Sequence, residues 1–247
     1  MKICAVQIRP VRGDIEHNII NHKKLIELAV SNEAGLIIFP ELSITGYEPS
    51  LAKELATTKD DARFDEFQNS SDNQNIIIGI GVPTKHETGV CITMVIFQPF
   101  KERITYSKKY LHKDEEPFFI PGENFPYLRL NKTNIGLAIC YELSVPEHSA
   151  TAFNSGADIY FASVAKSASG VDKASESLSA IARKYSAIVL MSNSVGPSDD
   201  FESAGTSSIW NKKGELAGQL NNTDEGILIF DTEIEEVIKQ TQIKLSV

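Results

Sequence analysis

Hydrophobic and polar positions divide this chain into short apolar runs that alternate with amphipathic or polar segments. The apolar runs predict strands at residues 3–8, 35–40, 76–82, 90–97, 104–108, 135–140, 157–164 and 187–192, with further short runs at 207–211 and 226–231. Helical spacing of apolar residues predicts helices at 14–32, 145–155 and 174–185, the first with Asp14 as N-cap. Residues 52–74 are polar and predict a surface helix and loop, and the prolines of 112–127 predict a loop.

The connections between these elements indicate how the strands pair. Strands joined through a helix are expected to be parallel, and strands joined by a short turn, as within 76–97, antiparallel. The sheet is therefore expected to be mixed, in an α/β or α+β fold. We see no internal repeat or linker, so we expect residues 1–247 to form a single domain.

Composition and charge exclude several classes of function. The net charge of -9 makes nucleic acid an unfavourable partner. No apolar run approaches the roughly 18 residues of a membrane helix, and the apolar start is too short for a signal peptide, so we expect a cytoplasmic protein that does not enter a membrane. Three cysteines without a CxxC spacing favour neither a disulfide framework nor a zinc site.

Two residues at strand ends carry candidate chemistry. Glu41 follows an apolar strand and Pro40, at an edge where α/β proteins bind ligands, and partial burial would suit it to act as a general base. A strand-end structural acid is the alternative. Cys140 stands between an apolar strand and a helix signal, as at a nucleophile elbow, where backbone N–H groups stabilise an oxyanion. Its alternative is an inert buried cysteine, which is the interpretation we favour for Cys4 and Cys91.

Charged residues near these two offer partners. Lys108 ends a short strand, and a lysine beside a thiol lowers its pKa and stabilises negative charge on oxygen. Lys109 points to the opposite face if the strand continues. Glu115 and Glu116 follow in the loop and would ordinarily be solvated. A Cys140–His148 dyad is the competing arrangement, although His148 is expected on the surface of a helix.

The chain resembles the nitrilase superfamily of carbon–nitrogen hydrolases over almost its whole length. The resemblance is carried by the opening strand, by Phe39-Pro40-Glu41 with Thr45-Gly46-Tyr47, by Tyr106-Ser107-Lys108-Lys109-Tyr110-Leu111, and by Gly136 to Glu142 around Cys140 with Pro146-Glu147. Later markers are Asn193, Gly196, Gly205, Ser207 and Gly214. One departure is Tyr110, where the family often has a histidine two residues after its lysine.

The resemblance implies roles for these residues and a fold. Glu41 would be the general base, Lys108 the oxyanion-stabilising lysine and Cys140 the nucleophile, with the backbone N–H of Tyr141 as a second oxyanion donor. A second glutamate would be Glu115, with Glu116 in reserve. The implied fold is a four-layer α-β-β-α sandwich that forms a homodimer, and the implied reaction needs no metal or organic cofactor.

The implied activity is hydrolysis of a small amide or N-carbamoyl compound through a thioester on cysteine. Loops 112–127 and 165–173 are expected to shape the pocket, and the small polar residues 163–170 would fit a compact substrate with a carboxylate or amine end. The alternatives are a true nitrile hydrolase, a Cys140–His148 thiol enzyme, or a catalytically silent binding or scaffold protein of the same fold.

Overall fold

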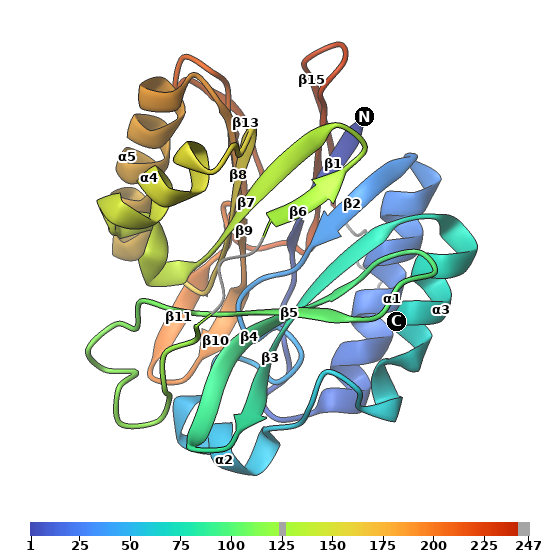
Figure 1. Cartoon of the computed structure of the whole chain (residues 1–247), viewed down its shortest axis with the longest axis vertical. Helices are drawn as coiled ribbons and strands as arrows, with labels where there is room; N and C mark the ends of the chain where they lie inside the picture. Colours follow the sequence, from blue (N-terminus) through green and yellow to red (C-terminus); the bar gives the residue numbers. More distant parts are fainter. Residues whose placement is uncertain (124–126, 242–247) are drawn as a thin grey trace.

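Two β-sheets lie face to face, and helices cover their outer faces in the computed structural model, which describes residues 1–123 and 127–241 (Figure 1). The first sheet has the strand order β15 (Glu236–Thr241), β14 (Gly226–Asp231), β1 (Lys2–Gln7), β2 (Ala34–Ile38), β3 (Ile77–His86), β4 (Gly89–Phe97) and β5 (Ile104–Ser107). The second has the order β13 (Leu216–Gln219), β12 (Ser208–Trp210), β9 (Ile188–Asn193), β8 (Ile159–Val164), β7 (Thr133–Ile139) and β6 (Tyr127–Leu130). A separate hairpin pairs β10 (Val195–Ser198) with β11 (Phe201–Ala204).

Both sheets are mixed, as the connections predict. The pairs β1–β2, β7–β8 and β8–β9 are parallel, and each is joined through a helix: α1 (Ile15–Ser31), α4 (Pro146–Asn154) and α5 (Ala168–Tyr185) respectively. The pair β3–β4 is antiparallel and joined by a tight turn. Parallel neighbours need a crossover and antiparallel neighbours do not, so the chain order decides the direction of each strand.

Local sequence signals predicted the start of α1 correctly but not the start of α5. Helix α1 begins after Asp14, whose side chain accepts a hydrogen bond from the backbone N–H of His17 at 3.0 Å, as the predicted N-cap requires. Helix α5 begins at Ala168 rather than at residue 174, so the expectation of a loop through residue 173 was wrong. Its first turn, Ala-Ser-Gly, is mostly exposed and has no apolar periodicity, but Val171 already packs in the core.

Three hydrophobic clusters correspond to the three interfaces between four layers. Along β2, Leu36 and Ile38 pack against the other sheet, whereas Ile37 packs beneath α1 and α3 (Asp65–Gln74). Along β9, Leu190 packs between the sheets and Val189 beneath α4 and α5. Because successive side chains of a strand point to opposite faces, these strands are apolar throughout. The predicted α-β-β-α sandwich is confirmed.

Several short elements were not predicted. Strands β6, β10, β11, β13 and β15 have polar or mixed sequences, and each is defined by hairpin pairing with a strand close to it in the chain. The polar segment 52–74, for which a surface helix and loop were predicted, holds α2 (Ala52–Leu55) and α3. Within residues 1–123 and 127–241, no helix combines the length and apolarity needed to cross a membrane. The single-domain organisation stays a prediction, supported by a core cluster that draws on both sheets.

Candidate active site

Cys140 occupies a sharp turn between β7 and a 3-10 helix, η3 (Cys140–Ser144). Its backbone φ of 45° lies in the left-handed region, which side chains other than glycine rarely adopt. The sulfur atom lies 3.9 Å from the carbonyl oxygen of Ala165, which follows β8. The strand, strained turn and helix thus reproduce the elbow that the sequence predicts, and strain of this kind is common at functional sites.

Glu41 is held in a buried turn directly after β2. Only 1% of the residue is exposed. The turn approaches β3 so closely that a Cβ at Gly81 would lie 2.4 Å from the backbone nitrogen of Leu42. Gly81 also accepts a hydrogen bond through its carbonyl from Ile44 N–H at 3.0 Å. The Gly81 position in an otherwise apolar strand therefore serves close backbone packing that places Glu41.

The Lys108 ammonium links two carboxylates in a fully buried setting. It donates to Glu41 Oε1 at 2.8 Å and to Glu115 Oε1 at 2.6 Å. The backbone of Lys108 is fixed as well, because its carbonyl accepts from Gly122 N–H at 2.7 Å. Lys109 is exposed, so the structure brings Lys108 and not its neighbour to Glu41.

Glu115, and not Glu116, lies in this cluster. Glu115 is 1% exposed, and besides Lys108 it accepts hydrogen bonds from the Tyr47 hydroxyl at 3.0 Å and from His112 N–H at 2.7 Å. Glu116 is exposed at the surface of the same loop. The expectation that both acids are ordinarily solvated thus holds only for Glu116.

Burial and charge together set the protonation of the cluster. Burial raises the pKa of Glu41 to about 7, although the Lys108 charge opposes this. Burial alone would lower the pKa of Lys108, but the charges of Glu41, Cys140 and Glu115 outweigh it and raise that pKa, so the lysine stays charged. Burial and then the Glu41 charge raise the pKa of Cys140 to about 11. The resting thiol is therefore protonated and needs a base to become a nucleophile.

Glu142 belongs to the sequence block around Cys140 but was not among the predicted site residues. Glu142 Oε2 accepts from Ile139 N–H at 2.8 Å and from the Tyr106 hydroxyl, and Oε1 accepts from Lys109 N–H at 2.7 Å. One buried carboxylate thus ties the strand end before Cys140 to the backbone beside Lys108. A charged residue two positions after the elbow was the only signal in the sequence.

His148 does not form a dyad with Cys140. Contrary to the expected surface position, it is fully buried. Its two ring nitrogens bond to the hydroxyls of Tyr106 at 2.9 Å and Tyr160 at 2.8 Å. Burial lowers its pKa to about 4, so it is neutral near pH 7. Sequence alone could not show the two tyrosines, which come from β5 and β8.

A cavity of about 340 Å³ opens onto Cys140. Tyr141 lines it with 37% of its surface exposed. The loop around Glu115 and the segment 165–170 form two walls, as expected. The other walls were not predicted and come from Tyr47, Pro49 and the turn between β10 and β11, residues 199–201.

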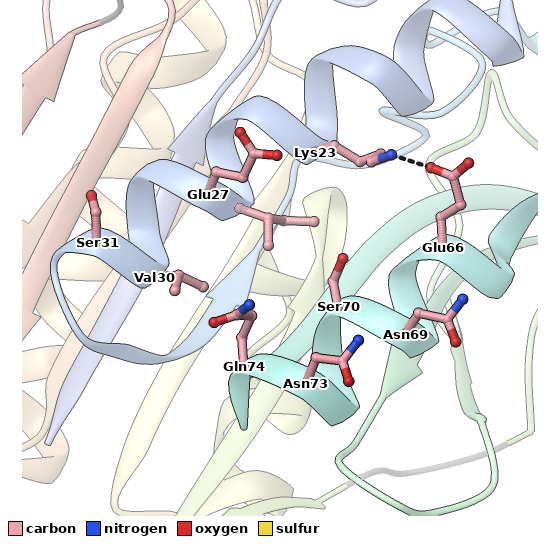
Figure 2. Close-up of a pocket in the computed structure, with 10 residues that line it drawn as sticks. Lys23, Glu27, Val30, Ser31, Glu66, Asn69, Ser70, Asn73 and Gln74 are labelled. Atoms are coloured by element: carbon pink, nitrogen blue, oxygen red, sulfur yellow. Dashed lines mark hydrogen bonds and ion pairs between the residues drawn. The ribbon is translucent and has the colours of Figure 1, made fainter.

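A second cavity, of about 460 Å³, lies in the groove between α1 and α3 (Figure 2). Lys23 of α1 and Glu66 of α3 form an ion pair across it. The rest of its lining is mainly amides, hydroxyls and aliphatic groups: Ile26, Glu27, Val30, Ser31, Asn69, Ser70, Asn73 and Gln74. No cysteine and no buried charged side chain lines it, in contrast to the cavity at Cys140. Among the residues described, no three His, Cys, Asp or Glu side chains are grouped to hold a metal ion.

Known proteins share both the sequence pattern and the fold. A family model described as carbon–nitrogen hydrolase matches residues 2–242. A 2-oxoglutaramate amidase of Bacillus subtilis is 26% identical over 95% of this chain and 91% of its own length. A glutamine-dependent NAD(+) synthetase of Thermotoga maritima is 22% identical over 97% of this chain, which spans only 43% of that relative. The structure of an amidase of the nitrilase superfamily from Nesterenkonia AN1 superposes with a TM-score of 0.86 at 23% identity, covering 95% of this chain and 92% of that one.

Proposed function

Since the chain belongs to the carbon–nitrogen hydrolase family, we propose that it hydrolyses a small amide or N-carbamoyl compound through a thioester on Cys140. One observation carries the proposal. The Lys108 ammonium bonds to both Glu41 and Glu115 in a buried cluster. Cys140 lies next to this cluster and lines the cavity. A base, a cation and a nucleophile therefore meet where a small substrate can enter.

The first half of the reaction forms the thioester. Glu41 takes the thiol proton as the Cys140 sulfur attacks the carbonyl carbon. The developing oxyanion is stabilised by Lys108 and by the backbone N–H of Tyr141. Glu41 then delivers its proton to the nitrogen, the carbon–nitrogen bond breaks, and ammonia or an amine leaves. Each oxyanion donor of this kind contributes roughly 3–4 kcal/mol.

The second half releases the acid. Glu41, now a carboxylate, removes a proton from water, and the resulting hydroxide attacks the thioester. The sulfur leaves as a thiolate and regains the proton from Glu41. Glu115 supports both steps by fixing the Lys108 ammonium at 2.6 Å. The pKa values favour this division of roles, because Glu41 at about 7 is poised to exchange protons, whereas Cys140 at about 11 is not ionised beforehand.

The proposal is tested with a panel of small amides, N-carbamoyl compounds and nitriles while released ammonia is measured. We expect amides or carbamoyl compounds to be hydrolysed, and Cys140→Ala to lose the activity while keeping its circular dichroism spectrum and melting temperature. The matched control is Cys91→Ala, which removes a thiol in β4 and should retain activity.

Other outcomes would replace the proposal by one of its alternatives. Hydrolysis of nitriles alone would identify a nitrile hydrolase. Ammonia release that survives Cys140→Ala would refute the role of the thiol, and no release from any compound would favour a silent binding protein. A homodimer, a cytoplasmic location, the absence of a cofactor and the absence of nucleic-acid binding stay predictions from the sequence.

A further inference from the structure

Lys166 lines the cavity at Cys140 and has no part in the proposed reaction. It follows Ala165, whose carbonyl oxygen lies 3.9 Å from the Cys140 sulfur, and it lines the same cavity. Its backbone is held on both sides, because its N–H donates to Asn193 Oδ1 at 2.9 Å and its carbonyl accepts from Ala204 N–H at 2.8 Å. The origin of the side chain is therefore fixed at the cavity wall.

The Lys166 ammonium has no anionic partner within the described part of the chain. None of the ion pairs among those residues includes it, whereas Lys108 is paired twice and His112 lies against Asp114. Lys166 is only partly exposed. The Lys166 charge also acts on Cys140. Burial and the Glu41 charge raise the pKa of Cys140, and among the charges that lower this pKa the effect of Lys166 is the largest. A half-buried, unpaired cation beside the reacting atom is a binding group for an anion.

The same wall contains the N-terminus of α5. This helix starts at Ala168, and no side chain caps it, since Ser167 makes no capping hydrogen bond. Ser167 and Gly170 line the cavity together with Lys166. Unsatisfied N–H groups and the helix dipole attract negative charge at this end. Lys166 and the N-terminus of α5 thus both favour the binding of an anion at this wall.

The acidic groups of the cavity do not cancel this preference. Asp114, Asp199 and Asp200 are exposed at its rim, where water and salt screen them. Glu115 is buried and shares the Lys108 cation with Glu41. Lys166 is therefore the cavity-lining cation that is left for a ligand, and the exposed negative charges lie toward solvent.

We propose that the cavity selects amides that carry a carboxylate, and that Lys166 with the N-terminus of α5 binds this carboxylate while Cys140 attacks the amide carbon. The inference rests on the proposed hydrolase function and adds the substrate class and a specificity residue to it. Lys166 is a binding residue in this scheme, distinct from Lys108, which serves the oxyanion.

The test compares matched substrates. Succinamate and glutaramate are each paired with a neutral amide of the same shape, in which an isopropyl group replaces the carboxylate. We expect the wild type to prefer the carboxylated member in kcat/KM by about 10- to 100-fold, the range of a charge-assisted hydrogen bond. Lys166→Met should lose most of this preference. Lys173→Met, at an exposed position of α5 outside the cavity, is the charge-matched control and should keep it.

The ratio of kcat/KM for a carboxylated amide to kcat/KM for its neutral partner separates binding by Lys166 from an effect of Lys166 on the thiol. If Lys166 acted only on the pKa of Cys140, Lys166→Met would lower both members of a pair equally and the ratio would stay constant, which would overturn the inference. Equal rates of the two members in the wild type would overturn it as well, while leaving the hydrolase function intact.

A binding measurement covers the case in which no amide is hydrolysed. Succinate or glutarate should slow the alkylation of Cys140 by iodoacetamide, followed by peptide mass spectrometry, and Lys166→Met should abolish this protection. Protection without hydrolysis would refute the proposed function and retain the anion site. Equal protection of the wild type and Lys166→Met, or none in either, would refute the site.

Discussion

Replacing Lys108 by methionine tests whether the buried charge cluster is organised as described. Met has a similar length but no charge, so Lys108→Met leaves Glu41 and Glu115 buried without their shared cation. Removing one partner of a buried ion pair costs about 3–5 kcal/mol of unfolding free energy. The exposed neighbour gives the matched control, because Lys109→Met removes the same charge where water screens it and should cost less than about 1 kcal/mol.

The unfolding free energy that Lys108→Met loses should increase as pH rises. Burial already raises the pKa of Glu41 from its ordinary value of 4.5 to about 7, so between these values Glu41 binds more protons in the folded protein than in the unfolded chain. The contribution of Glu41 to stability therefore falls as pH rises toward 7 and then levels off. Without Lys108 the pKa of Glu41 rises further, because the positive charge that opposes the effect of burial is lost. The decline should then continue above pH 7, at about 1.4 kcal/mol per pH unit for each proton retained by the folded state.

The assay is urea unfolding of the wild type and both variants from about pH 5 to pH 8. Trp210 in β12 is the only tryptophan and is 3% exposed, so its fluorescence reports the loss of the core. We expect Lys108→Met to lose most stability at the alkaline end and least at the acidic end, where Glu41 is protonated. A pH-independent cost no larger than that of Lys109→Met would refute the reasoning.

Two further predictions concern the reaction. Because Glu41 must be ionised to accept the thiol proton, kcat/KM should rise about tenfold per pH unit up to a pKa near 7 and then level off; an acid limb centred near 4.5 would exclude this role. Glu115→Gln should lower kcat/KM by about 100-fold or more, since the amide holds Lys108 less firmly, whereas Glu116→Gln at the exposed neighbouring position should stay within about twofold of wild type. Equal effects of the two substitutions, measured by ammonia release, would show that Glu115 has no special part.

Local sequence patterns were enough for most of the architecture. The strand predicted at residues 35–40, which is β2 (Ala34–Ile38), is apolar because both of its faces are buried, and the capping of α1 by Asp14 is complete within four residues. The Cys140 elbow was equally visible, since an apolar strand that ends at a polar turn is a local event. These features depend on neighbours in the chain, so the chain alone predicts them.

Residue chemistry and spacing did not separate the adjacent like residues; the family resemblance favoured Lys108 and Glu115, and the tertiary structure shows the physical difference. Glu115 and Glu116 are chemically the same in the sequence, and only the loop's packing turns one toward Lys108 and the other toward water. The same is true of Lys108 and Lys109. A loop without periodicity carries no signal of which side chain faces inward.

The sequence by itself determined the order of the main strands and helices, the family pattern and the candidates Glu41, Lys108 and Cys140. The tertiary structure alone decided which groups meet. Lys108 and Glu41 are 67 positions apart, and the hydrogen bond from Lys109 N–H to Glu142 joins residues 33 positions apart. The burial that raises the pKa of Glu41 exists only once two sheets close over it. Charges interact through space, and distance in space is set by the packing of remote strands rather than by spacing along the chain.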